Sequence, residues 1–110
     1  MIERKIIAYK NYYGDFMESL SAGVRKKMHY VLDLLASQDR ISKKFVDHIR
    51  DGLYELRAEY EGNIYRIFFI FDGDKIVVLF NGFQKKTKKT PEKEIQKALR
   101  IKKEYYESKQ

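Results

Sequence analysis

Two arginines and a lysine-rich segment are the side chains of this sequence best suited to chemistry on an anion. Arg57 and Arg66 lie in neighbouring β-rich runs, and the segment Lys85–Lys89 follows the next run. A guanidinium group can donate two parallel hydrogen bonds to a phosphate, and an ammonium group adds a concentrated charge. If the intervening elements bring these groups together, the sequence predicts a surface that binds a polyanion.

The positive charge of the chain is concentrated near its C-terminal end. The 110 residues carry 23 Lys and Arg against 16 Asp and Glu, a formal net charge of +7. Such a field raises the local concentration of polyanions, which favours nucleic acid as a partner ahead of an acidic protein. A basic surface that serves only solubility is the alternative. The segment from Gln84 to Lys103 contains only two acidic residues, Glu92 and Glu94. Its basic residues are Lys85, Lys86, Lys88, Lys89, Lys93, Lys97, Arg100, Lys102 and Lys103.

The amino-acid composition argues against thiol chemistry, a metal site and a membrane span. Cysteine is absent, which removes disulfides, thiolate nucleophiles and thiolate metal ligands. The two histidines, His29 and His48, lie too far apart for a metal motif, and no cofactor is expected. No apolar run approaches a membrane span, and the N-terminal segment is charged where a signal peptide is apolar. We expect a cytoplasmic protein without a membrane partner, in which residues 1–110 form a single domain.

Changes in hydrophobic period predict an α+β fold with a small antiparallel sheet. Apolar residues recur at three- and four-residue steps from Ser21 to about Ser37, which predicts an amphipathic helix capped by Ser21. From Leu53 the period becomes two, and short Gly-containing turns predict a three-stranded meander. Thr90 and Pro91 predict the N-cap and first position of a C-terminal helix. The expected elements are a strand at Ile2–Tyr9, helices at Asp15–Leu20, 21–37 and Ser42–Ile49, strands at Leu53–Tyr60, Ile64–Phe71 and Lys75–Phe83, and a helix from Pro91 to about Tyr106.

Hairpin register decides which side chains share a face of this sheet. With two-residue turns in both hairpins, Arg66 lies opposite Glu59 on one side and Asn81 on the other. Arg57 and Arg66 are then expected on one open face, so Arg66→Ala should abolish activity without unfolding the protein. A set of surface salt bridges is the alternative explanation of these charges. The opposite face, expected to pack on the N-terminal helices, carries Tyr54, Leu56, Ala58, Tyr60, Tyr65, Ile67, Phe69, Phe71, Ile76, Val78 and Phe80.

Three further residues near the open face each have two interpretations. Glu55 is a candidate general base or a paired surface acid. His48 could swing towards the site as an acid or base, or be a histidine at the end of a helix or on the surface. Phe83, together with Phe68, could stack an RNA base or pack beneath the C-terminal helix.

Three strings in a fixed order carry a resemblance to a known family. They are Gly52-Leu53-Tyr54-Glu55-Leu56-Arg57, then Tyr65-Arg66, then Phe83-Gln84-Lys85-Lys86-Thr87 with Thr90-Pro91. With these strings the chain resembles, over most of its length, the phage-derived, HigB-like branch of the RelE/ParE toxins. The resemblance implies a short antiparallel sheet with two N-terminal helices on one face. It also implies a metal-independent endoribonuclease that cleaves mRNA on the ribosome and a cognate antitoxin, often of the helix-turn-helix type, as partner.

The resemblance further implies roles for the cations. In this chemistry the ribose 2′-hydroxyl attacks the adjacent phosphate, and the enzyme neutralises a pentavalent phosphorane. No His or Tyr lies between Phe83 and Arg100, where several ribonuclease members place one, so the general acid and base are unassigned. The implied catalytic residues are Arg57, Arg66, Lys85 and Lys86, and the implied contacts to the RNA backbone are Lys88 and Lys89.

Two other functions are open at this point. A ParE-like toxin of the same fold would inhibit DNA gyrase by binding alone, and the missing acid and base residues are compatible with it. An inactive basic binding module would account for the charge without any chemistry. Growth arrest with intact mRNA distinguishes the first alternative, and failure to inhibit growth distinguishes the second.

Overall fold

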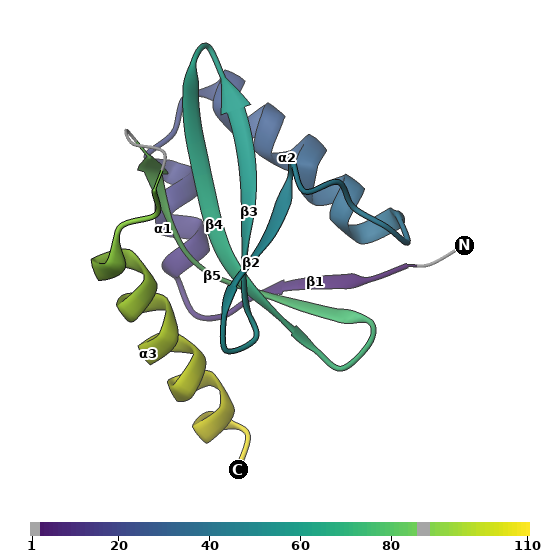
Figure 1. Ribbon diagram of the computed structural model, residues 1–110, viewed down its shortest axis with the longest axis vertical. Coiled ribbons are helices and arrows are strands. Elements are labelled where there is room, and N and C mark those ends of the chain that lie inside the picture. Colours follow the sequence, from purple (N-terminus) through teal and green to yellow (C-terminus); the bar gives the residue numbers. More distant parts are fainter. Residues whose placement is uncertain (1–2, 86–88) are drawn as a thin grey trace.

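The computed structural model describes residues 3–85 and 89–110, which form one mixed five-stranded sheet and three helices. The strand order is β1-β5-β4-β3-β2, with β1 parallel to β5 and the other pairs antiparallel (Figure 1). The predicted α+β class is confirmed. Along the chain the elements are β1 (Lys5–Ala8), α1 (Tyr12–Glu18), α2 (Ala22–Ser37), β2 (Val46–Arg50), β3 (Leu53–Tyr60), β4 (Asn63–Asp72), β5 (Ile76–Lys85) and α3 (Glu92–Ser108).

The predicted meander is confirmed as β3, β4 and β5, but its first register differs from the prediction. The β3–β4 turn consists of Glu61 and Gly62, both with positive φ (50° and 79°), as a tight hairpin turn requires. Arg66 therefore lies opposite Arg57 rather than opposite Glu59. Because side chains alternate between faces with a period of two, this two-residue shift changes partners and keeps both arginines on one face.

The β4–β5 hairpin overturns the predicted faces of β5. The turn contains three residues rather than two, and a bulge interrupts the pairing between Ile67 and Phe69. One extra residue moves the side chains that follow it to the other face. Beyond the bulge, Arg66 pairs with Phe83 rather than with Asn81. Of the β5 residues assigned to the α2 face, Ile76 is exposed and Val78 and Phe80 pack towards α3, whereas Val77 and Leu79 pack towards α2.

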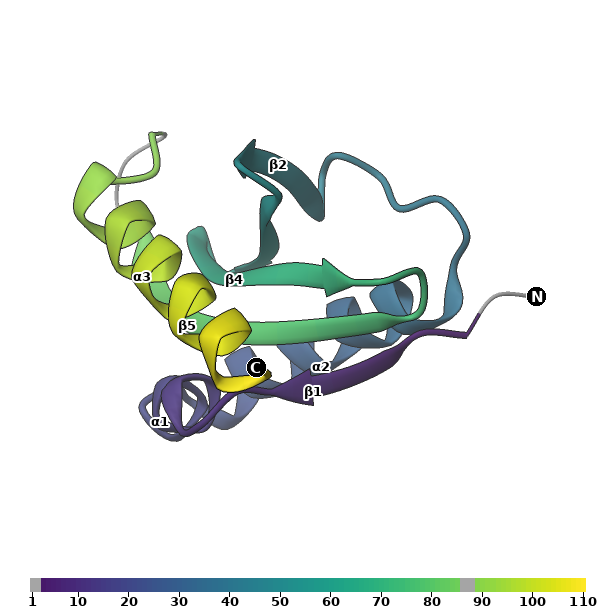
Figure 2. The same cartoon turned by 90° about the horizontal axis from the view of Figure 1, so that it is seen from below.

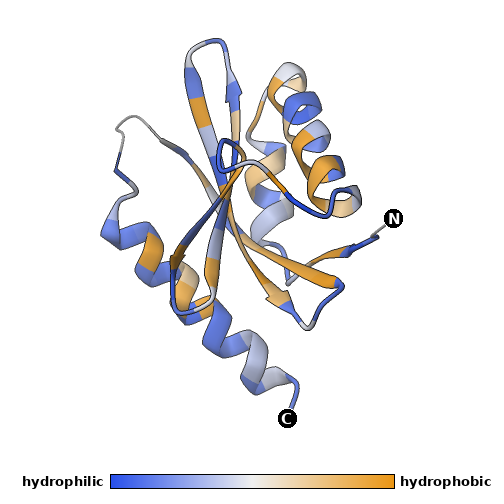
Figure 3. Cartoon of the chain, turned by 45° about the vertical axis from the view of Figure 1, so that its right-hand side comes forward, coloured by the Kyte–Doolittle hydropathy of each residue, from blue (hydrophilic) through white to orange (hydrophobic). Residues whose placement is uncertain are grey.

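Helices cover both faces of the sheet (Figure 2). On one face, Met28, Val31 and Leu35 of α2 pack against β3 and β4 in a first core cluster. On the other face, α3 contributes Ala98 and Ile101 to a second cluster. Figure 3 shows the apolar residues concentrated in the central strands and in stripes along the helices, with hydrophilic residues on the outer side of α3. The sheet is therefore the middle layer of three.

The N-terminal elements are close to the prediction. The first strand covers Lys5–Ala8 of the expected segment, whose Ile2 lies outside the described residues, and the first helix begins three residues earlier than expected, at Tyr12. This helix packs against the end of β5, where a Cβ added to Gly82 would overlap the ring of Phe16. Glycine at this position thus allows α1 to approach the sheet closely.

The prediction for α2 is confirmed, whereas the helix predicted at Ser42–Ile49 is wrong. Ser21 caps α2 by accepting a hydrogen bond from the backbone N–H of Val24 (3.4 Å). Residues 46–50 instead form β2, which pairs with the outer edge of β3. The spacing of the apolar residues Phe45, Val46 and Ile49 fits a helix. Without β2, however, β3 would be an edge strand with unpaired backbone groups, and those groups favour another strand as a partner.

Helix α3 is docked by apolar contacts and by polar contacts at both ends. Its N-cap is Pro91 rather than the predicted Thr90, and the helix begins at Glu92. Arg50 of β2 donates two hydrogen bonds to Glu92, at 2.8 and 2.9 Å, and Asp72 accepts from Tyr105 (2.5 Å) near the other end. None of the helices in the described ranges is long and apolar enough to cross a membrane. The buried residues of α3 are Ile95, Ala98, Ile101 and Tyr105, whereas Leu99 is half-buried and Tyr106 is exposed.

Candidate functional site

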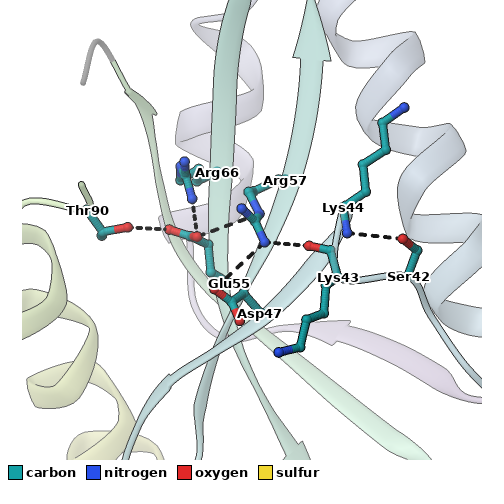
Figure 4. Close-up of polar contacts among 8 residues, drawn as sticks. All are labelled: Ser42, Lys43, Lys44, Asp47, Glu55, Arg57, Arg66 and Thr90. Carbon is teal, nitrogen blue, oxygen red and sulfur yellow. Dashed lines mark hydrogen bonds and ion pairs between the residues drawn. The ribbon is translucent and has the colours of Figure 1, made fainter. Parts of the chain in front are cut away.

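A buried ion pair lies at the centre of the region that the sequence singled out. Glu55 of β3 and Arg66 of β4 are 1% and 4% exposed, and a guanidinium nitrogen of Arg66 donates to Oε2 of Glu55. The hydroxyl of Thr90 donates to the other carboxylate oxygen, at 2.8 Å (Figure 4). One carboxylate thus joins two strands to the segment that leads into α3.

The expectation that Arg66 lies on an open face is wrong. Arg66 is on the predicted face of the sheet, but its side chain is buried there, and the segment carrying Thr90 contacts Glu55 beside it. A guanidinium buried without a counter-ion would be very costly, and the carboxylate of Glu55 supplies the compensating charge. Arg66 therefore acts on its surroundings through Glu55 and does not reach the surface.

Arg57 is the arginine that reaches solvent. Its side chain is 26% exposed, and its guanidinium group donates to the backbone carbonyl of Lys43. Two carboxylates lie on other sides of the group, with Asp47 Oδ2 3.8 Å from an Nη atom and Glu55 Oε2 3.9 Å from Nε. Figure 4 shows this guanidinium held between the Glu55 network and the segment before β2. Its orientation is therefore fixed from several directions.

A hollow of about 550 Å³ opens beside Arg57. It extends along the edge of β3 towards the β3–β4 turn and around to α2. Its charge is mixed, with three basic and two acidic side chains, and apolar contact surface comes from one aromatic and one aliphatic residue. The lining residues are Lys27, Lys44, Phe45, Arg57, Glu59, Glu61, Gly62 and Ile64.

The described part of the chain contains little of the lysine-rich segment. Lys85 ends β5 opposite Ile64, but its side chain, together with Lys86 and Lys88, lies outside the described residues. Lys89 is exposed. Its charge contributes to holding the pKa of Glu92 below the usual value, after hydrogen bonds from Gln96 and Arg50.

The other candidates from the sequence do not meet at the hollow. His48 lies in β2 opposite Tyr54 and contacts the edge of that ring (5.0 Å between centroids), whereas its neighbour Asp47 lies opposite Glu55. Adjacent strand residues point to opposite faces, so His48 points away from the Glu55 network. His48 is an exposed residue of a strand, so the interpretation as a surface histidine fits the structure and the interpretation as a helix-end histidine is wrong.

Phe83 packs in the interior on the α3 side. Its half-buried ring stacks on fully buried Phe68, with 5.4 Å between centroids and 26° between the ring planes. Both rings therefore pack beneath the C-terminal helix, as one of the two interpretations predicts.

The sequence reasoning missed several residues around Arg57. Asp47 was placed in a helix, and only a strand at residues 46–50 brings it opposite Glu55. The sequence predicts Thr90 as a helix cap, whereas in the structure its hydroxyl donates to the carboxylate of Glu55. Glu59 gave a usable signal, since it follows Arg57 by two residues on a strand and therefore shares its face. Exposed Glu59 lines the hollow together with Arg57.

This arrangement suits the binding of a phosphate. Arg57 offers a fixed planar donor group at the border of a hollow, and Lys27 and Lys44 add charge from two other segments. Buried Glu55 is occupied by Arg66 and Thr90 and orients the site rather than contacting a ligand. Within residues 3–85 and 89–110, no three His, Asp or Glu side chains gather in a way that could hold a metal ion.

Comparison with protein families gives a match over most of the chain. A family model described as phage derived protein Gp49-like matches residues 15–103. No curated protein sequence matches the chain. The matched range begins in α1 and ends within α3, so it includes the Glu55 network and every residue that lines the hollow.

Proposed function

Because this chain belongs to the phage-derived Gp49-like family, we propose that it is the toxin of a toxin–antitoxin pair, an endoribonuclease that cleaves mRNA on the ribosome. The three strings that resemble HigB-like toxins of the RelE/ParE group support this proposal, and all fall within the matched range. A net charge of +7 supports a polyanionic substrate. An acidic antitoxin is the partner that goes with this function.

The observation that carries the proposal is the fixed guanidinium of Arg57 beside the hollow. In the proposed reaction the scissile phosphate binds Arg57, and the guanidinium neutralises the charge that grows on the phosphate oxygens as the 2′-hydroxyl attacks. Arg66 is a positioning residue, which acts through Glu55 on the orientation of Arg57. Lys85, Lys86, Lys88 and Lys89 are proposed to contact the RNA backbone.

Glu59 is the proposed general base. Its carboxylate is exposed, and it lies on the face of β3 that carries Arg57, two residues further along the strand. In the proposed step it takes the proton of the 2′-hydroxyl, as a carboxylate within hydrogen-bond reach of a bound nucleotide can do. The new bond from the 2′-oxygen to phosphorus gives a 2′,3′-cyclic phosphate, and the 5′-oxygen leaves with the electrons of the broken P–O bond and takes a proton from water.

Primer extension on ribosome-bound mRNA tests the proposal. The wild-type protein is expected to produce breaks at defined positions, and Arg57→Ala to lower the rate about 100-fold or more, since the donor acts on the transition state. Arg57→Lys should recover only part of the activity, because one ammonium group cannot replace the planar fork. Glu59→Gln should lower the rate without weakening RNA binding. Lys75→Ala, which removes an exposed charge at the β4–β5 turn, is the matched control.

Intact mRNA in the presence of folded wild-type protein would contradict the proposal. Inhibition of DNA gyrase is then the second candidate, because the described lining of the hollow contains neither His nor Tyr. A DNA-supercoiling assay with purified gyrase decides between them, since a ParE-like toxin would block supercoiling and leave ribosomal mRNA uncut.

A further inference from the structure

A second hollow, of about 320 Å³, adjoins the first on the side of α2. The two hollows share Lys27, so they lie on either side of the same side chain. The second hollow is lined by Gly23, Lys26, Lys27 and Tyr30 of α2 and by Tyr60 at the end of β3. Its described lining therefore combines two lysines with two tyrosines and contains no carboxylate.

Tyr30 presents an unusually open aromatic ring in this hollow. Its side chain is 52% exposed, and the ammonium group of Lys27 lies 5.4 Å from the ring centroid. Among the residues that the structure describes, neither Lys26 nor Lys27 forms an ion pair within 4 Å of a carboxylate. The cations of this surface are thus available to an anionic ligand.

The shape of the hollow depends on a close approach between α2 and the β3–β4 hairpin. A Cβ added to Gly23 would overlap the hydroxyl group of Tyr60, so only glycine lets the Tyr60 ring lie against the helix. Figure 1 shows the first turns of α2 beside this hairpin. Tyr60 therefore closes one side of the hollow while Tyr30 remains open to solvent.

We propose that this second hollow binds a nucleotide of single-stranded RNA that flanks the phosphate held at Arg57. The base stacks on Tyr30, and the neighbouring phosphates bind Lys26 and Lys27. This inference deepens the proposed function and rests on it for the position of the scissile phosphate at Arg57, from which the strand passes Lys27 into the second hollow. Aromatic rings interleaved with lysines are the arrangement by which proteins hold unpaired strands, because every base has a face that stacks.

The mixed charge of the first hollow favours RNA over an acidic peptide. A ligand that crosses Lys27 passes Glu59 and Glu61, which line the first hollow and would repel a run of carboxylates. A nucleic acid combines anionic phosphates with the N–H donors of its bases, and a carboxylate can accept hydrogen bonds from those donors. The two acids thus oppose an acidic peptide and remain compatible with a nucleotide.

Binding of a fluorescein-labelled single-stranded RNA, measured by anisotropy at fixed salt, tests the inference. Tyr30→Ala is expected to raise the Kd about five-fold or more, and Tyr30→Phe to leave it unchanged because the ring is kept. Lys27→Ala should also weaken binding and reduce its dependence on salt. Tyr106→Ala and Lys75→Ala are the matched controls, since they remove an exposed ring and an exposed charge elsewhere.

Photocrosslinking locates the strand without reference to activity. RNA containing 5-bromouridine should crosslink to the peptide that carries Tyr30 or to the one that carries Tyr60. Equal affinity of wild type and Tyr30→Ala, or crosslinks confined to α3, would overturn the inference. So would wild-type protein that ignores this RNA but binds poly-glutamate through Tyr30, because the occupant would then be an acidic peptide.

The cleavage assay separates failure of this inference from failure of the proposed function. If wild-type protein cuts mRNA and Tyr30→Ala changes neither cleavage nor binding, the second hollow is not part of the RNA path and the proposed function stands. If wild-type protein binds RNA through Tyr30 and cuts no mRNA, the inference holds and the proposed function fails.

Discussion

The guanidinium group of Arg66 and the carboxylate of Glu55 form an ion pair across β4 and β3 from which water is almost completely excluded. Removing one partner of such a pair leaves an uncompensated buried charge, so Arg66→Ala should lower the free energy of unfolding by about 3 to 5 kcal/mol. Urea denaturation followed by circular dichroism measures this change. Arg50→Ala, which breaks the exposed pair with Glu92, is the control and should cause only a small loss. An unchanged midpoint for Arg66→Ala would show that the pair is not buried in solution.

Thr90 is expected to stabilise the same network from the segment before α3. Thr90→Val removes the hydroxyl that donates to Glu55, and hydrogen bonds to a charged acceptor contribute about 1.5 to 3 kcal/mol. Thr90→Ser keeps the donor and should retain most of that stability. Thermal unfolding of the two variants in parallel checks the difference, and equal loss in both would indicate that the methyl group of Thr90 matters rather than its hydroxyl.

Because α1 packs closely on β5, the substitution Gly82→Ala should lower the free energy of unfolding. A methyl group at Gly82 would overlap the ring of Phe16, and overpacking of this kind costs about 1 to 3 kcal/mol. Gly14→Ala is the matched control, because a Cβ at Gly14 meets no atom within 4 Å and alanine favours the helix by about 0.5 to 1 kcal/mol. Chemical denaturation should therefore shift in opposite directions for the two variants.

Acid should weaken the attachment of α3. The pKa of Asp72 is lowered by hydrogen bonds from Lys109 and then from Tyr105, and the pKa of Glu104 is lowered chiefly by Lys10. A carboxylate with a lowered pKa binds protons more weakly in the folded than in the unfolded state, so its stabilisation is present above the unfolded pKa. That stabilisation is lost as pH falls below the ordinary values of 3.8 and 4.5 towards the lower folded pKa.

Urea midpoints at pH 6 and at successively lower pH measure this acid dependence. Asp72→Asn should flatten the decline, because the amide cannot take up the proton that destabilises the folded state. A decline of the same steepness in Asp72→Asn would assign the effect to other carboxylates.

Local sequence patterns predicted the helices and strands whose apolar periodicity and capping residues agree with their packing in the fold. Ser21 and the apolar residues after it specify α2, and the alternation from Leu53 specifies the meander, because burial on one side repeats every second residue. Residues 46–50 could not be identified in the same way. Their spacing fits a short helix, and the partner that makes them a strand, the edge of β3, is a distant element rather than a local signal.

The shared face of Arg57 and Arg66 was predicted from the sequence, but the burial of Arg66 was not. Arg57 and Arg66 share a face as expected, yet their environments differ because Thr90 reaches back to Glu55 from beyond β5. The bulge between Ile67 and Phe69 lies beside the strand glycine Gly82, a type of residue that marks either a bulge or a close approach and so does not by itself set the register. Which arginine is buried therefore depends on long-range geometry, and the sequence predicted exposure for both.

The parallel pairing of β1 with β5 has a consequence for how the protein matures. Lys5 pairs with Ile76, so the first strand has no neighbour in the sheet until most of the polypeptide has been synthesised. Closing so long a loop is entropically unfavourable and slows folding. A nascent chain therefore cannot complete its five-stranded sheet until β5 has emerged from the ribosome, however early the segment of β1 is synthesised.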